Sequence, residues 1–146
     1  MNEVKNFLTD AHKEKIIAAI KKAEKNTSGE IRVHIENHAN KPTFERAVEV
    51  FNMLNMYKTD ARNGVLFYLA IADKAFAIIG DKGIDAVVPK GFWDSIKDTV
   101  IKQFKQKAFA EGLKLGILAT GEKLKQYFPL QINDKNELSD DISIGN

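Results

Sequence analysis

The sequence contains no cysteine among its 146 residues. Disulfide bonds, zinc sites with thiolate ligands and cysteine nucleophiles are therefore excluded. Long apolar runs are lacking as well, since no stretch approaches the length of a membrane span and residues 1–15 mix acidic residues with lysines where a signal peptide has an apolar core. These absences predict a protein that does not insert into a membrane, with the cytoplasm as its default location.

An excess of charge of one sign is also missing. Lysine and arginine number 22 against 20 aspartate and glutamate residues, which leaves a net charge of +2. A nucleic-acid-binding domain shows a clustered basic footprint, whereas the two signs alternate here along most of the chain, so we expect no nucleic-acid partner. Hydrophobic residues make up 44% of the sequence, an ordinary globular composition, and the length suits one self-supporting domain.

Hydrophobic periodicity predicts the order helix, strand, helix, strand, strand, helix, helix. Helices are expected from about residue 10 to 25, 43 to 54, 92 to 104 and 109 to 128, and strands over 30–36, 65–71 and 76–79. The first strand alternates strictly between apolar and polar residues, which predicts that one face, with Glu30, Arg32, His34 and Glu36, meets solvent. Residues 1–128 then form one domain, and the polar residues 129–146 form a loosely held tail.

The connections between the strands predict the topology. The helix after the first strand makes strands one and two parallel, with a right-handed crossover. Only Ala72, Asp73 and Lys74 separate strands two and three, so these two strands form an antiparallel hairpin. The fold class is therefore α/β, a small mixed sheet with helices on both faces. The starts of strands one and two and the end of strand three should lie along one edge.

This edge gathers acidic and amide side chains from residues 28–30, 60–64 and 80–85. Carboxylate oxygens are available from Glu30, Asp60, Asp81 and Asp85, and Asn63 adds a neutral oxygen. Such oxygens are the ligands that Ca²⁺ or Mg²⁺ prefers. In an alternative interpretation, Glu30 and Asp81 form surface ion pairs with Arg62 and Lys82, and the glycines of the edge serve only its turns.

The same three junctions carry a resemblance to a known family. Ser28-Gly29-Glu30-Ile31-Arg32-Val33, then Arg62-Asn63-Gly64-Val65-Leu66, then Ile79-Gly80-Asp81-Lys82-Gly83-Ile84 with Phe92-Trp93 beyond it resemble the motifs of the TPM domain. The resemblance implies a three-layer α/β/α sandwich, and among family members calcium binding and acid phosphatase activity. Lacking a leader and an anchor, this chain is most similar to the stand-alone soluble bacterial branch. Its third motif departs from the Gly-Tyr-Gly-Leu-Glu form of exported members.

Two functions follow from these residues and the resemblance. The favoured one is a binding or interaction module without catalysis that holds a divalent cation, Ca²⁺ or Mg²⁺, and serves an unidentified protein partner. The alternative is a metal-dependent acid phosphatase for phosphate monoesters, in which Glu30 and Asp81 hold a metal that activates water and Arg62 or Lys82 neutralises the phosphate. No sequence motif for a nucleophile or a phosphate-binding loop supports the alternative.

Two further patterns invite a functional interpretation. His34, Glu36 and His38 would share a face of an extended strand and hold a transition metal, but residues 37–42 are typical of a loop and a solvated strand face is the favoured interpretation. Lys97, Lys102, Lys105 and Lys107 form a run of positive charge on a helix. A solvated face is favoured there over a site for an anionic partner.

Overall fold

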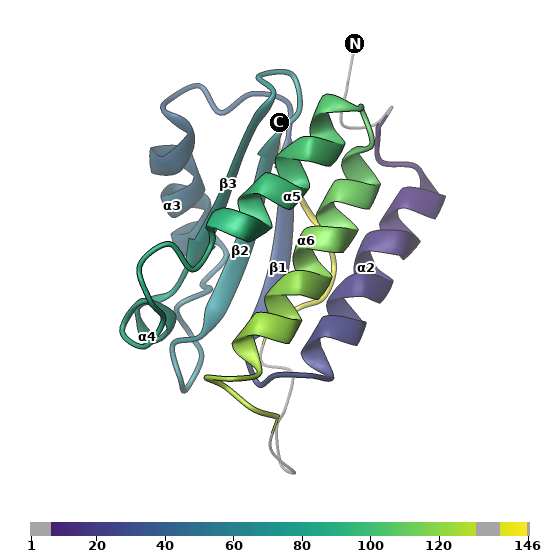
Figure 1. Ribbon diagram of the computed structural model, residues 1–146. Coiled ribbons are helices and arrows are strands. Elements are labelled where there is room, and N and C mark those ends of the chain that lie inside the picture. Colours follow the sequence, from purple (N-terminus) through teal and green to yellow (C-terminus); the bar gives the residue numbers. More distant parts are fainter. Residues whose placement is uncertain (1–6, 131–137, 146) are drawn as a thin grey trace.

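A computed structural model describes residues 7–130 and 138–145, and it shows a sheet between two layers of helices (Figure 1). The strands are ordered β3-β2-β1-β4. The elements are α2 (Asp10–Glu24), β1 (Glu30–Glu36), α3 (Thr43–Met53), β2 (Gly64–Ala70), β3 (Ala75–Gly80), α4 (Lys82–Asp85), α5 (Asp94–Lys105), α6 (Phe109–Leu124) and β4 (Ser143–Ile144). Helices α2, α5 and α6 cover one face of the sheet and α3 covers the other (Figure 1), as the predicted three-layer sandwich requires.

The main core lies between the sheet and the three-helix layer. Its fully buried residues include Ile16 and Ile20 of α2, Leu113 and Ile117 of α6, and Ile31, Val33 and Ile35 of β1. The helical residues recur every three or four positions and the strand residues every second position, so each element presents one apolar surface to the other. Within the described part of the chain, no helix is long and apolar enough to cross a membrane.

The sheet has the predicted mixed topology. Strand β1 runs parallel to β2 with Glu30 opposite Gly64, and β2 runs antiparallel to β3 with Val65 opposite Gly80. The starts of β1 and β2 and the end of β3 therefore meet at one edge, which confirms the geometry inferred from the connections.

Three of the four residues on the polar face of β1 are buried and Arg32 is half-buried, so the prediction that this face meets solvent was wrong. Glu30, His34 and Glu36 are 3%, 4% and 0% exposed. Residues 138–145 supply part of the cover, since β4 pairs with β1 in parallel and places Ser143 opposite His34. These residues are thus not a loosely held tail, while residues 131–137 lie outside the described structure. Alternation shows that the two faces of a strand differ in polarity, but it does not show that the polar face is exposed to solvent.

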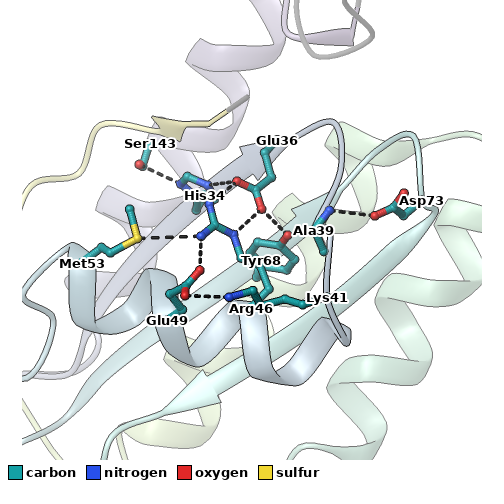
Figure 2. A network of polar contacts seen from close by, with 10 residues as sticks. All are labelled: His34, Glu36, Ala39, Lys41, Arg46, Glu49, Met53, Tyr68, Asp73 and Ser143. Carbon is teal, nitrogen blue, oxygen red and sulfur yellow. Dashed lines mark hydrogen bonds and ion pairs between the residues drawn. The ribbon is translucent and has the colours of Figure 1, made fainter.

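A network of hydrogen bonds neutralises this buried polar face (Figure 2). The guanidinium of Arg46 in α3 donates to both carboxylate oxygens of Glu36, from Nε and Nη2 at 2.9 Å each. The hydroxyl of Tyr68 in β2 donates to the same carboxylate, and His34 Nε2 lies 3.0 Å from Glu36 Oε1. On the far side of its ring, His34 Nδ1 lies 2.8 Å from Ser143 Oγ. One carboxylate thereby links β1, β2, α3 and, through His34, β4.

The network fixes the charge states of its members. Burial alone raises the pKa of Glu36, but hydrogen bonds from Arg46, Tyr68 and His34 outweigh it and lower the pKa from 4.5 to about 2. Burial lowers the pKa of His34 below 6.5, more than the neighbouring Glu36 raises it. At neutral pH the network therefore combines a carboxylate, a guanidinium and a neutral imidazole.

We predict that Glu36→Gln lowers the free energy of unfolding by about 1–3 kcal/mol, because Arg46, Tyr68 and His34 lose a fully buried charged acceptor, although Arg46 keeps its more exposed partner Glu49. Urea unfolding followed by circular dichroism measures the change. The matched control is Glu111→Gln, which breaks the half-exposed pair of Glu111 with Lys15 and should cost about 0–1 kcal/mol. Equal losses in the two variants would contradict a structural role for the network.

The stability difference between wild type and Glu36→Gln should itself depend on pH. In the unfolded chain Glu36 takes up its proton near its ordinary pKa of 4.5, but in the folded protein only near 2. Below 4.5 the unfolded chain therefore binds more protons, and the stabilisation is lost as pH falls through this window. The free energies of unfolding of the two proteins should be compared at pH 6, 5, 4 and 3. Their difference should be the same at pH 6 and 5 and should decrease below pH 4.5. A difference that does not change with pH would mean that the charge of Glu36 is not responsible.

Candidate functional site

Backbone hydrogen bonds hold together the three segments of the predicted acidic edge. The amide of Glu30 donates to the carbonyl of Asn63 at 3.2 Å, and the amide of Asp81 donates to the carbonyl of Gly64 at 2.9 Å. These bonds continue the pairing of β1 with β2 and of β2 with β3 beyond the strand ends. The side chains at the three junctions are therefore carried on one rigid framework.

Glycine at position 83 allows α4 to dock on this framework. The amide of Gly83 donates to the carbonyl of Arg62 at 2.9 Å, and a Cβ atom at position 83 would lie only 2.1 Å from the carbonyl oxygen of Ala61. No larger residue fits without moving the backbone. At the start of α4, the carboxylate of Asp81 caps the helix by accepting from the amide of Lys82 at 2.7 Å.

Asp81 and Arg62 form a bidentate ion pair at the centre of the edge. Arg62 Nε donates to Asp81 Oδ2 at 2.7 Å, and Nη2 donates to Oδ1 at 3.0 Å. The side chain of Asp81 is 5% exposed and that of Arg62 is 35% exposed. The structure therefore agrees with the ion-pair interpretation for Asp81 and Arg62. Lys82 instead donates its backbone amide to the same carboxylate.

The remaining predicted ligands differ in how close they come to this pair. Asp85 lies on exposed α4, and its pKa is raised first by partial burial and then by the negative charge of Asp81, so the two carboxylates repel each other. Glu30 is buried and its Oε1 accepts from the amide of Leu138 at 2.7 Å. Asn63 is buried and its amide donates to Ser28 Oγ at 3.4 Å. Asp60 lies in the exposed turn that leads into Arg62.

Two acidic residues near the edge were not predicted from the sequence. Glu24, at the end of α2, accepts from the amide of Ile31 at 3.0 Å. Burial, followed by its contact with the carboxyl group of Asp140, raises the pKa of Glu24 to about 9. Glu24 is therefore protonated at neutral pH. No pattern links Glu24 to Asp140, because they are brought together by the return of the C-terminal segment alongside β1.

The side chains of His34, Glu36 and His38, the alternative transition-metal site, do not come together. His34 and Glu36 belong to the buried network, while His38 follows the end of β1 and its Nδ1 lies 2.9 Å from Asp73 Oδ1 at the surface. Across residues 7–130 and 138–145, no three histidine, aspartate or glutamate side chains are arranged to hold a metal ion.

Comparisons with known proteins agree with the fold. The chain is 48% identical to the BA42 protein of the psychrophilic bacterium Bizionia argentinensis, whose NMR structure superposes with a TM-score of 0.91 over 95% of this chain and 96% of that one. The N-terminal domain of a protein from P. gingivalis is 20% identical with a TM-score of 0.64, over 83% of this chain and 78% of that one. The N-terminal domain of the cg2496 protein from Corynebacterium glutamicum is 13% identical with a TM-score of 0.59, over 95% of this chain and 80% of that one. The last two comparisons show a shared fold only.

The search of curated proteins gave no match. The model of the TPM domain, in contrast, matches residues 1–123, a range that contains all three junction motifs and the Arg62–Asp81 pair. This match covers most of the chain, and the BA42 structure follows it almost from end to end. The chain therefore belongs to the TPM domain family.

Proposed function

We propose that this TPM domain binds a divalent cation, Ca²⁺ or Mg²⁺, at the acidic edge and acts as a binding module without catalysis. The observation that carries the proposal is the Arg62–Asp81 pair with Asp85 beside it. Two carboxylates on one rigid edge, one of them almost fully buried, create a site that needs a positive charge. In the described structure the guanidinium of Arg62 supplies that charge, so it stands where a cation would bind.

Binding then consists of an exchange between Arg62 and the cation. Arg62 is the more exposed partner, and swinging its guanidinium into solvent would free Asp81 Oδ2 and leave Oδ1 with only the amide of Lys82. Asp85, loop carbonyls, the Asn63 side-chain oxygen and water would complete the set of oxygen ligands that a hard cation requires. Glu30 and Asp60 would add negative charge along the edge. Because an ion pair must open first, we expect a weak dissociation constant, on the order of 10⁻⁴–10⁻³ M.

The exchange predicts opposite effects for the two partners of the ion pair. Arg62→Gln should raise the affinity for Ca²⁺ by up to about fivefold, because it removes the competing charge, while Asp81→Asn should lower it by about tenfold or more, because it removes a charged ligand. Isothermal titration calorimetry of chelator-treated protein with Ca²⁺, Mg²⁺, Mn²⁺ and Zn²⁺ measures both. Lys15→Gln, which breaks a half-exposed ion pair between α2 and α6, should leave the affinity unchanged.

The position of the amide shifts tests the same proposal. Backbone resonances at residues 62–64 and 80–85 should move on titration, because these segments carry the ligands. Shifts centred on Ile31 and Asp140 would place the ion at the Glu24–Asp140 pair and overturn the exchange, as would a loss of affinity in Arg62→Gln. Turnover of p-nitrophenyl phosphate that disappears with a chelator would replace the non-catalytic role with the phosphatase alternative.

Docking of α4 should also matter for the cation. Gly83→Ala introduces a Cβ that overlaps the carbonyl oxygen of Ala61, so α4 must move away and carry Asp85 with it. We expect a loss of about 1–3 kcal/mol in the free energy of unfolding and a fall in Ca²⁺ affinity of about tenfold. Ala86→Gly, at the exposed end of α4, is the control that should retain the affinity. Unchanged binding in Gly83→Ala would exclude Asp85 from the site.

A further inference from the structure

A cavity of about 780 Å³ opens at the end of the sheet opposite the acidic edge. Its lining residues come from the β2–β3 turn, the start of α3, α5 and the connection from α5 to α6. Its apolar lining includes Phe76 of β3, Ile101 and Phe104 of α5, and Phe109 of α6. Ile101 is 41% exposed, an apolar surface that the described fold leaves in contact with water. The volume lies within the range of about 300–1,000 Å³ typical of small-molecule sites.

The aromatic floor of this cavity is already organised. The rings of Phe76 and Phe104 meet edge to face, with centroids 5.4 Å apart, and the rings of Phe104 and Phe109 lie 5.2 Å apart. Such contacts hold aromatic side chains in fixed orientations. An apolar ligand would thus meet a preformed surface and would lose little free energy to ordering the protein.

Positive charge surrounds the same cavity. Lys74, Lys105 and Lys107 line it, and none of the other described residues that line it is acidic. In residues 7–130 and 138–145, none of these lysines makes an ion pair with a carboxylate. The cavity also reaches Thr43, the first residue of α3, where the helix dipole adds partial positive charge. An apolar interior with this rim is complementary to a molecule that has an apolar body and one anionic end.

Two of the three lysines stand at strained backbone positions. Lys74 has φ of 54° and Lys107 has φ of 60°, the left-handed region that glycine and asparagine occupy at lower cost. Each residue lies in a tight turn where glycine would serve the fold better. The turns carry ammonium groups at the cavity despite this cost, which points to a use for the charge there.

We propose that this cavity binds a single-chain amphipathic anion of the fatty-acid class. Its alkyl chain would lie over Phe76, Phe104 and Phe109, and its carboxylate would sit among Lys74, Lys105 and Lys107. The lysine run seen in the sequence is thereby divided, because Lys105 and Lys107 line the cavity whereas Lys97 and Lys102 do not. The cation edge lies at the other end of the sheet, so the two sites are independent.

The test uses dodecanoate below its critical micelle concentration and the full chain. Calorimetry should show saturable binding of one dodecanoate, with amide shifts at residues 74–76 and 101–109. Butyrate, which has the same head group without the chain, and dodecyltrimethylammonium, which has the same chain with the opposite charge, should each bind at least tenfold more weakly. Rising salt should weaken dodecanoate binding, because the lysines are solvent-accessible.

Variants separate the lysine charges from the stability of the fold. Lys74→Gly and Lys107→Gly should each weaken dodecanoate binding by about twofold to fivefold, while the thermal midpoint stays the same or rises because the positive φ is relieved. Lys74→Asn and Lys107→Asn, which also tolerate this backbone, provide the same test if a glycine variant folds poorly. The triple variant, which combines Lys74→Gly, Lys105→Gln and Lys107→Gly, lacks all three charges and should bind dodecanoate more than tenfold more weakly. Lys97→Gln and Asp81→Asn should leave it unchanged.

Several results would overturn the proposal. Equal affinity for the cationic surfactant would show that the chain alone is recognised, and an unchanged affinity in the triple variant would exclude the lysines. Amide shifts away from the cavity would exclude the site itself. Binding to anionic phospholipid vesicles or to an acidic peptide, without binding of free dodecanoate, would mean that the surface serves a membrane or a protein in place of a small ligand.

Discussion

The carboxylate of Glu36 is completely buried, and its need for partners constrains much of the fold. A charge that leaves water must be paired and hydrogen-bonded, or the folded state is destabilised by several kilocalories per mole. Arg46 meets this need from α3, Tyr68 from β2 and His34 from within β1. Helix α3 must therefore lie where its guanidinium reaches β1, and β4 is anchored beside β1 through His34 and Ser143. A polar residue thus specifies the packing of elements that apolar contacts alone would hold less specifically.

With β1 fixed in this way, the two ends of the sheet are left with different chemistry. At one end, the starts of β1 and β2 and the end of β3 bring together acidic residues on backbone segments that hydrogen-bond to one another. At the other end, the short β2–β3 turn and the α5–α6 connection leave phenylalanines and lysines around a cavity. Between the two ends, β2 is buried along its whole length. Loops carried on such a scaffold can differ in function without affecting the core.

Local sequence patterns predicted the elements whose signals lie within a few residues. The alternation of residues 30–36 located β1, and the three-residue gap Ala72 to Lys74 predicted the hairpin. Contacts between distant segments could not be predicted in this way. The sequence predicted that Glu36 is solvent-exposed because its partners Arg46 and Tyr68 lie in other elements. Strand β4 has only two residues and so shows no periodicity. Glu24 contacts Asp140 only because the C-terminal segment returns alongside β1. At the acidic edge, sequence alone left the Arg62–Asp81 pair and a cation site as alternatives.

The edge motifs serve the fold before they serve any ligand. Gly83 lets α4 approach the Ala61 carbonyl, Asp81 caps α4, and Arg62 clamps Asp81. Each of these residues has a structural reason to be present, so a motif match at this edge indicates the TPM fold and does not by itself indicate an activity. Asp85 is different, because it is exposed and its carboxylate faces repulsion from Asp81. In the proposed cation exchange, Asp85 is therefore the ligand for which the described structure gives no other role.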